Sequence, residues 1–442
     1  MRFYDRNTEI EELRRIQKLA FEDYSKMTII TGRRRIGKTS LADKVCEDTP
    51  TVYLFVAKKA EALLCADFIE AINTSLGIYV PSDVTSFPSI FRMLLNESRD
   101  KRFNVIIDEF QNFIKINPSI YSEMQNIWDK LRKQSHINLI VCGSAYSLMH
   151  KIFEDEKEPL FGRQDNTLHL STFPIDTLKE IYADYYPEYT HEDLLALYSF
   201  TGGVPKYVEL FMDNRIFTKD AMIDFMIRRD SYFIGEGKNL LVEEFGKDYA
   251  IYFSILGAIS SGTNTQSDIE SLIGVGIGGN IKRLVEDYNI IARETPFGSK
   301  PATKTIRYVI CDNFLTFWFR YIHRKQAVVE IGNFPLLRKI VSDDYTTFTG
   351  RTLEMYFRQK MKDSMDYQAI GTWWDPSDKE NQCEIDIVCI DALNASKAYA
   401  WEIKRNPDKF NRKQLLFKVE RLKGKVLKKC DVIPGFLSMD DM

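Results

Sequence analysis

Short, almost wholly apolar runs alternate with helical patterns through the first 172 residues. Four of these runs have the length of single strands and are rich in Val, Ile, Leu and Phe, at residues 27–30, 51–56, 103–107 and 137–143. A further strand is expected at 167–170, and a helix at 7–21 with Asn7 or Thr8 as its cap. Continuous apolar strands between helices predict a parallel sheet covered on both faces, and hence an α/β domain at 1–172.

The middle of the chain changes to a helical pattern. Residues 173–243 are expected to form a helical lid, and residues 244–330 a second module that ends in an aromatic docking helix. Within this module, three helices followed by a hairpin predict a winged-helix arrangement, with elements at 249–259, 266–273, 279–288, 290–294 and 306–310. Its third helix carries few cations, so DNA reading and a protein or intramolecular contact stay equally open.

The last part, residues 331–442, predicts a smaller α/β domain. A helix is expected to begin at Gly350, and apolar strands follow at 370–374, 384–390 and 398–404. The predicted fold class is therefore α/β, with a parallel sheet, a helical lid, a winged-helix module and a C-terminal α/β domain.

Composition restricts the classes of partner and the cellular compartment that we expect for the protein. The chain has 442 residues and a net charge of −3, so any nucleic-acid surface must be local. Its seven cysteines are scattered without a C-x-x-C, and its five histidines are dispersed, which argues against disulfide or zinc frameworks. No apolar stretch is long enough for a membrane span and the N-terminus lacks a signal core, so we expect a cytoplasmic protein without a membrane partner.

A glycine-rich loop with the spacing G-x-x-x-x-G-K-[ST] follows the first apolar run, at residues 32–39. Its glycines let backbone N–H groups curl around a triphosphate, its lysine reaches the outer phosphates, and its Thr39 hydroxyl is placed to hold Mg²⁺. A surface loop rich in Gly and Arg is the competing interpretation, but it leaves the buried strand before the loop unexplained. We expect ATP and Mg²⁺ as cofactors, with nucleotide contacts from Gly32, Gly37, Lys38, Thr39 and Ser40.

Polar side chains end two further strands of the expected sheet. Asp108 and Glu109 follow the third apolar run, and Ser144 follows the fourth. Ligands bind beyond the carboxyl ends of parallel strands, so these residues and the loop are expected at one edge. Mg²⁺ shared by Asp108 and Thr39 would neutralise the carboxylate, Glu109 would orient or deprotonate the attacking water, and Ser144 would bond that water or the γ-phosphate. A strand-end turn is the competing interpretation.

Three more residues are candidates for the nucleotide site. Arg163 lies on a short Gly/Pro loop and could supply transition-state charge within the chain or to another copy of a homo-oligomer. Arg6 precedes the first helix, where a contact near the nucleotide competes with a solvated charge. Pro205 ends a Gly-Gly-Val-Pro turn that must approach another group closely.

Residues 1–240 resemble the archaeal-type ATPases, P-loop proteins related to the STAND and AAA+ groups. The resemblance is carried by Phe3, Arg6, Glu9, the loop 32–40, residues 106–111, Gly143, Ser144, residues 159–163 and residues 202–205. It implies an ATPase with a γ-phosphate-sensing or finger role for Arg163 and a position near the base for residues 203–205. In that family a glycine precedes the first arginine, whereas this chain has Asp5, which weakens an adenine-pocket role for Arg6.

The C-terminal domain carries a second candidate chemistry. Asp386 interrupts an apolar strand, and Glu402 and Lys404 alternate with apolar residues, so their side chains share a face. Two carboxylates can hold Mg²⁺, and the lysine can polarise water or phosphate. This resembles the PD-(D/E)xK nuclease superfamily, with Glu354 as the preceding helix acid, and the ATPase group often ends in such a restriction-endonuclease-like region of unknown function. A hairpin with a surface Asp and an alternating salt-bridge pair is the competing interpretation.

A local basic excess lies beside these residues. From residue 404 to residue 429 there are 11 Lys and Arg against two acids, which suits a phosphate backbone, whereas a solvated basic helix is the usual meaning of such a run. We therefore expect an Mg²⁺-dependent ATPase whose C-terminal half binds DNA, and we leave open whether it cleaves DNA. The alternative is a nucleotide-driven signalling or assembly scaffold with an inactive nuclease-like domain.

Overall fold

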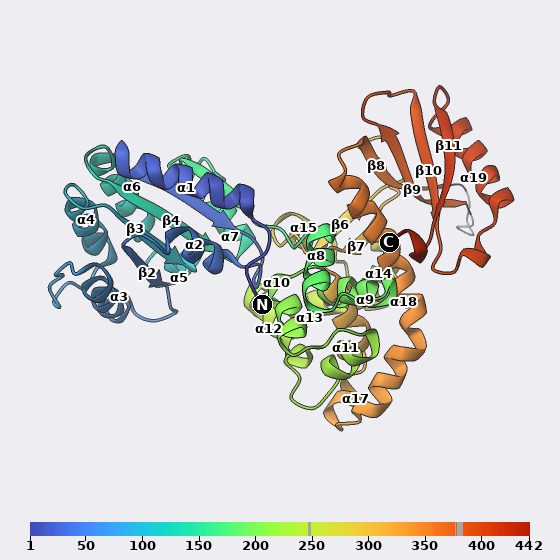
Figure 1. Cartoon of the computed structure of the whole chain (residues 1–442), viewed down its shortest axis with the longest axis horizontal. Coiled ribbons are helices and arrows are strands. Elements are labelled where there is room, and N and C mark those ends of the chain that lie inside the picture. The colour runs from blue at the N-terminus through green and yellow to red at the C-terminus, as the bar shows by residue number, and fades with distance from the viewer. Residues whose placement is uncertain (246–248, 376, 378–382) are drawn as a thin grey trace. The chain divides into compact units, whose positions relative to one another are not determined.

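The computed structural model describes residues 1–245, 249–375, 377 and 383–442 (Figure 1). The chain divides into two compact units, Phe3–Thr172 and Phe173–Met442, the second of which also contains Met1 and Arg2. Two of the predicted boundaries, at 243/244 and 330/331, fall inside the second unit. Helix α12 (Tyr232–Phe245) runs across the first of them, and residues 246–248 lie outside the described residues. In the described part of the chain, every helix is too short or too polar to span a lipid bilayer.

The N-terminal unit is built on a five-stranded parallel sheet with strand order β2-β3-β4-β1-β5. Its strands are β1 (Lys26–Thr31), β2 (Thr51–Phe55), β3 (Phe103–Asp108), β4 (Ile137–Gly143) and β5 (Asn166–His169). The helices are α1 (Asn7–Glu22), α2 (Lys38–Cys46), α3 (Glu61–Leu76), α4 (Phe87–Glu97), α5 (Phe113–Ile116), α6 (Ser119–Leu131) and α7 (Tyr146–Glu154). The predicted parallel α/β sheet is confirmed.

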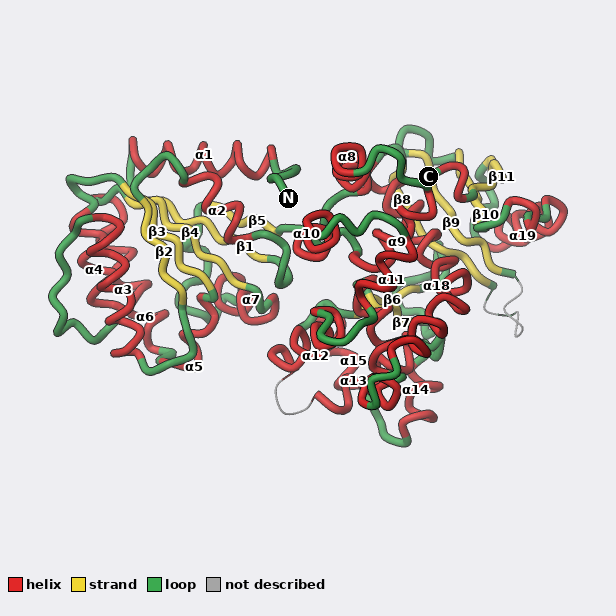
Figure 2. Tube along the Cα trace, turned by 60° about the horizontal axis from the view of Figure 1, so that its bottom comes forward, coloured by secondary structure: helices red, strands yellow, loops and turns green. Residues whose placement is uncertain are grey.

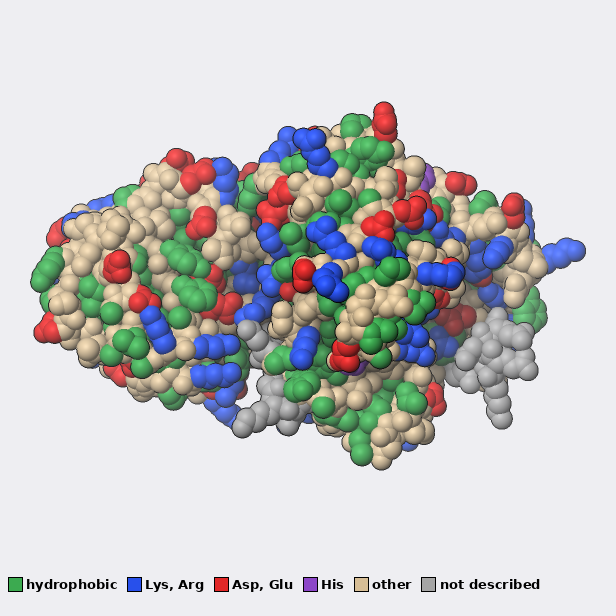
Figure 3. All heavy atoms as spheres, turned by 90° about the horizontal axis from the view of Figure 1, so that it is seen from below, with side chains coloured by type: hydrophobic (Ala, Val, Ile, Leu, Met, Phe, Trp, Pro, Cys, Tyr) green, Lys and Arg blue, Asp and Glu red, His purple; other side chains and the backbone are tan. Residues whose placement is uncertain are grey.

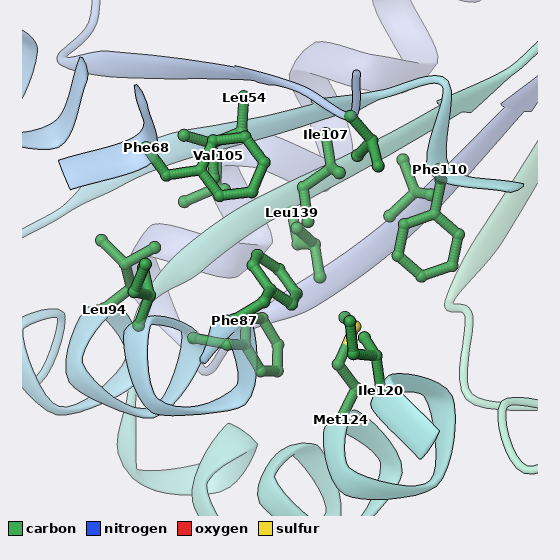
Figure 4. Packing of buried hydrophobic residues seen from close by; sticks show 14 of the residues in the cluster. Leu54, Phe68, Phe87, Leu94, Val105, Ile107, Phe110, Ile120, Met124 and Leu139 are labelled. Carbon is green, nitrogen blue, oxygen red and sulfur yellow. The ribbon is translucent and has the colours of Figure 1, made fainter. Parts of the chain in front are cut away.

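Helices cover both faces of this sheet, and its central strands are therefore buried along their whole length. Figure 2 shows α1 on one side of the strands and α3, α4 and α6 on the other. The larger core lies on the second side, where strand residues such as Val105 and Leu139 face Phe87 and Met124 of the helices (Figure 4). The smaller core joins α1 and α2 to the opposite face, so α2 and the loop before it rest on a packed surface.

The start of α1 differs from the prediction. Its cap is Arg6, in the left-handed region at φ 71°, and neither Asn7 nor Thr8 caps the helix, because both lie inside it. The Arg6 carbonyl accepts from the Ile10 N–H at 2.8 Å, so the backbone rather than a side chain closes the first turn.

The second unit begins with helices, as predicted. They are α8 (Ile175–Tyr185), α9 (His191–Thr201), α10 (Pro205–Asp213), α11 (Lys219–Met226), α12, α13 (Tyr249–Ser260), α14 (Gln266–Ile273) and α15 (Gly278–Glu286). The antiparallel hairpin of β6 (Ile291–Glu294) and β7 (Arg307–Ile310) follows. The elements expected for a winged helix are therefore present in order, while the winged-helix interpretation itself stays a prediction.

A second sheet closes the chain. Aromatic α16 (Asn313–Phe317) and a π-helical turn at Trp318–His323 lead to α17 (Gln326–Glu330) and α18 (Phe334–Asp363). The sheet has the order β11-β10-β9-β8. Its first three strands in the chain are β8 (Tyr367–Trp374), β9 (Glu384–Asp391) and β10 (Lys397–Ile403), and each is antiparallel to the next. Helix α19 (Arg412–Lys425) then crosses to β11 (Asp431–Leu437), which is parallel to β10.

The predicted start of a helix at Gly350 is wrong, because α18 begins sixteen residues earlier, at Phe334. A glycine inside a helix costs about 1 kcal/mol relative to alanine, which made Gly350 look like a boundary. Apolar residues on both sides of it are buried, including Val341, Tyr345, Phe348 and Leu353. Their packing sustains one continuous helix through the glycine.

Candidate functional site

The glycine-rich loop joins β1 to α2 in a conformation that needs its two glycines. Gly32 has φ +151°, and a Cβ there would lie 2.8 Å from the Leu170 carbonyl oxygen. Gly37 has φ +90° and caps α2, which begins at Lys38. The backbone of the loop therefore packs closely against the segment after β5, and the positive N-terminus of α2 lies next to the loop.

Lys38 is folded into this loop. Its ammonium group donates to the carbonyl oxygens of Gly32 at 2.8 Å and Arg33 at 3.0 Å. Burial lowers the pKa of Lys38, whereas the nearby Asp108 and Glu109 carboxylates act to raise it. A buried ammonium held only by carbonyl oxygens is a ready partner for a phosphate.

Asp108, the last residue of β3, accepts hydrogen bonds at both of its carboxylate oxygens. Its Oδ2 atom accepts from the Thr39 hydroxyl and from the Tyr53 hydroxyl, each at 2.7 Å. Its Oδ1 atom accepts from the Glu109 N–H at 2.8 Å. Burial and the bond to Asp108 raise the pKa of Tyr53, so Tyr53 stays a protonated donor.

The next residue, Glu109, has a backbone in the left-handed region, at φ 54°. Both of its carboxylate oxygens accept hydrogen bonds. The Ser144 hydroxyl lies 3.0 Å from each carboxylate oxygen, and the Gln111 amide donates to Oε2. The structure therefore brings Thr39, Asp108, Glu109 and Ser144 into one hydrogen-bonded group at the carboxyl edge of the sheet.

The remaining candidates of the nucleotide site have other partners. Arg6 is buried, pairs with Glu9 at 3.3 Å and donates to the Ser171 carbonyl, next to the Leu170 carbonyl that Gly32 approaches. Arg163 pairs with Asp129 at 3.2 Å. Ser40 is exposed in the first turn of α2, and Pro205 starts α10 in the second unit.

Two residues of this group, Gln111 and Tyr53, were not predicted as site residues. Gln111 lies two positions after Glu109, and that short spacing was the available signal. For Tyr53 the sequence contains no such signal, because its hydroxyl meets Asp108 only through the pairing of β2 with β3.

The donor set fits a magnesium ion beside a triphosphate. One hydroxyl, Thr39, and one carboxylate, Asp108, lie within hydrogen-bond distance of each other next to the phosphate-type loop. Hard oxygen donors of this kind are what Mg²⁺ takes when phosphates complete its coordination. A bound ion would be held by Thr39 and Asp108.

The C-terminal sheet gathers a second charged cluster. Lys404 lies 2.8 Å from Glu402 and 3.5 Å from Asp386, so one ammonium group bridges the two carboxylates. Asp386 also accepts from the Ile403 N–H at 2.7 Å. Lys418 of α19 is buried and donates to both Glu402 oxygens, at 3.1 and 3.0 Å. In the sequence, nothing distinguishes Lys418 from the other basic residues of the run 404–429.

Glu354, on α18, faces the same cluster. Burial, and then the nearby Asp386 carboxylate, raise the pKa of Glu354, and burial with Glu402 raises the pKa of Asp386. Among the described residues, however, no three or more His, Cys, Asp or Glu side chains are arranged to hold a metal ion. The metal-binding roles predicted for Asp386, Glu402 and Glu354 stay predictions.

The hairpin β6–β7 packs against this domain. The Phe297 N–H donates to the Thr372 carbonyl at 2.8 Å, and Arg307 pairs with Glu384 at 2.8 Å. Glu294 accepts from Arg358 at 2.6 Å, and Arg358 in turn donates to the Thr372 hydroxyl. These bonds favour the intramolecular role that the sequence left open for the module.

Much of the basic excess is used inside the domain. Arg421 and Lys425 pair with the buried Asp375, Arg405 pairs with Glu192, and Lys404 and Lys418 pair as described above. On the face in Figure 3, basic and acidic side chains are interspersed. Within the described residues, five exposed basic residues of the run make no ion pair: Lys409, Arg412, Lys413, Lys428 and Lys429.

The parallel sheet with a phosphate-type loop and an acidic strand end defines a P-loop ATPase domain. Residues 3–211 match the family described as an ATPase domain predominantly from Archaea, and residues 318–415 match archaeal and bacterial proteins of unknown function. The uncharacterized protein MJECL04 of Methanocaldococcus jannaschii is 30% identical over 412 residues, which cover 91% of this chain and 87% of the relative. The chain belongs to this family of archaeal-type ATPases.

A solved structure has the same fold. The Walker-type ATPase PABY2304 of Pyrococcus abyssi aligns with a TM-score of 0.55 and 19% identity, over 72% of this chain and 96% of that one. At this identity the likeness supports the fold alone.

The raised pKa of Glu354 leads to a stability prediction. A carboxyl whose pKa is higher in the folded than in the unfolded chain stabilises the fold fully below its unfolded value, and loses that contribution as the pH rises. Glu354→Gln removes the ionisation, so the variant should be more stable than wild type by about 1 kcal/mol at pH 8 to 9 and no more stable at pH 4.

Urea unfolding midpoints of the full chain, measured from pH 4 to pH 9, check this. Asp343→Asn, an exposed acid of the same helix that pairs with Lys339, is the matched control and should show little pH dependence. A difference between Glu354→Gln and wild type that stays constant over this range would contradict the assignment.

Proposed function

We propose that the N-terminal unit hydrolyses ATP at the edge formed by the loop, Asp108, Glu109 and Ser144. The observation that carries this is the continuous hydrogen-bonded group from Thr39 through Asp108 to the Glu109 backbone, with Ser144 on the Glu109 carboxylate. The members come from the loop and from the ends of two neighbouring strands, β3 and β4, so a γ-phosphate placed beside the loop would meet all of them.

The roles follow from charge and position. Lys38 and the loop N–H groups hold the phosphates, and Lys38 exchanges its carbonyl partners for phosphate oxygens. Thr39 and Asp108 would hold Mg²⁺, which would supply positive charge to the bound phosphates. Glu109 orients the attacking water and accepts its proton, while Ser144 and Gln111 fix the direction of its carboxylate. Arg163 would have to leave Asp129 to act as a finger.

We further propose that the C-terminal domain binds DNA and cleaves it at Asp386, Glu402 and Lys404. Support comes from the convergence of two buried carboxylates on one lysine, and from exposed cations near α19, such as Lys409, Arg412 and Lys413. Exposed cations bind the phosphate backbone, and the cluster could then polarise a phosphodiester.

One observation favours the alternative, a nucleotide-driven signalling or assembly scaffold whose nuclease-like centre is inactive. Both oxygens of Glu402 already accept from Lys418, and among the residues that the structure describes no three acids are arranged to hold a metal ion. A centre neutralised by its own lysines has less affinity for a divalent cation, which would leave a binding domain without chemistry.

For the ATPase, Lys38→Ala should abolish nucleotide binding, whereas Glu109→Gln should bind ATP and hydrolyse it more slowly by roughly 100-fold or more, the usual contribution of a general base. Phosphate release and fluorescent-nucleotide binding by the full chain measure the two effects separately. Glu123→Gln, a control acid on α6 of the same unit, should behave as wild type. Unchanged hydrolysis in both site variants would overturn the assignment.

For the C-terminal domain, the test is Mn²⁺- or Mg²⁺-dependent cleavage of duplex and single-stranded DNA, with and without ATP. Asp386→Asn should reduce cleavage by roughly 100-fold or more because it removes a cation ligand. Asp408→Asn, an exposed acid in the same basic segment, changes the charge equally and should leave cleavage intact. Wild-type binding of DNA without any cleavage selects the inactive alternative, and equal cleavage by both variants contradicts the site.

A further inference from the structure

Helix α9 is fixed at both ends and buried along most of its length. Its first turn is closed by a reciprocal cap, in which the Thr190 hydroxyl accepts from the Asp193 N–H and the Asp193 carboxylate accepts from the Thr190 N–H. Gly202, in the left-handed region, ends it. All residues from Asp193 to Thr201 are buried. A helix of this length spans about 16 Å, and one held in this way moves as a single body.

The N-terminal turn of α9 holds the residue next to Lys404. Arg405 donates to both oxygens of Glu192, at 2.9 and 2.6 Å, and also donates to the Thr349 hydroxyl of α18. Its guanidinium lies 5.3 Å from the ring centroid of Tyr345. Both bonds to Glu192 come from one guanidinium nitrogen, and the side chains of Arg405 and Glu192 are 14% and 33% exposed. This partly shielded ion pair holds the chain just after the end of β10.

The other end of α9 is tied to the segment that leaves the ATPase domain. Phe173 is the first residue after Thr172, where the N-terminal unit ends, and its N–H donates to the Gly203 carbonyl at 2.8 Å. Gly203 follows the cap of α9 directly. A displacement of the chain at Phe173 is therefore imposed on the C-terminal end of α9 through one backbone hydrogen bond.

The ion pairs of Lys404 are sensitive to small shifts of the backbone at residues 404 and 405. Its ammonium group bridges Glu402 at 2.8 Å and Asp386 at 3.5 Å, so a movement of less than 1 Å decides which carboxylate it pairs with. Figures 1 and 2 both show α9 beside α18, and the two helices pack together. The Glu192–Arg405 pair is a direct ionic link from α9 to the residue that follows Lys404.

We propose that Glu192 and Arg405 are positioning residues for Lys404, and that α9 makes the C-terminal cluster respond to the nucleotide state of the ATPase domain. The proposal rests on the proposed function for ATP binding, and it assigns a regulation to the second site. Neither residue touches the reacting groups, since both act through the backbone of Lys404.

The test uses hydrogen–deuterium exchange of the full chain with a non-hydrolysable ATP analogue and with ADP. In wild type, amides of 397–405 should exchange at rates that differ between the two nucleotides by roughly fivefold, the usual size of a coupling effect. Glu192→Gln should abolish that difference while nucleotide affinity and ATP turnover stay unchanged. The charge-swapped double variant Glu192→Arg with Arg405→Glu should restore it.

Glu209→Gln is the matched control, because Glu209 forms an ion pair of similar length with Lys206 on the adjacent helix α10. It should retain the nucleotide-dependent difference. If wild type binds nucleotide but shows no difference at 397–405, or if Glu192→Gln keeps the difference, the proposal is overturned. These outcomes do not depend on DNA cleavage. If wild type does not bind nucleotide at all, the proposed ATPase site is refuted instead.

Discussion

A carboxylate at the end of a buried strand must have partners, and the partners of Asp108 organise the N-terminal unit. Moving an unpaired carboxylate out of water costs several kcal/mol, so β3 can end in Asp108 only where hydroxyl and N–H donors await it. Thr39 from the glycine-rich loop and Tyr53 from the edge strand supply them. The loop, the sheet register and the direction of Glu109 are thereby linked at one edge of the sheet.

The second unit meets the same constraint differently. Its carboxylates, Asp386 and Glu402, are paired with Lys404 and Lys418, both from their own domain. An acid satisfied by hydroxyl groups keeps its charge available for a cation, whereas an acid satisfied by ammonium groups is already neutralised. This difference supports the proposed Mg²⁺ site at Asp108, whereas a cation at the C-terminal cluster would have to share its carboxylates with lysines.

The sequence was enough to predict features that depend on local pattern. Continuous apolar runs predicted the parallel sheet, and the positions of Asp108, Glu109 and Ser144 at strand ends predicted that they would meet. Features that depend on distant partners were missed. Arg405 pairs with a residue 213 positions away, and Lys418 is buried although other cations of the same basic run, such as Arg412 and Lys413, are exposed. The helix boundary at Gly350 failed because tertiary packing outweighs the intrinsic propensity of one glycine.

The central claim is that the two carboxylate clusters differ in their demand for a divalent cation, and Mn²⁺ binding followed by electron paramagnetic resonance tests it most directly. With a non-hydrolysable ATP analogue, the full chain should bind one additional Mn²⁺ tightly. That ion should be lost in Asp108→Asn and kept in Asp386→Asn. A nucleotide-dependent ion that persists in Asp108→Asn, or that disappears in Asp386→Asn, would contradict the claim.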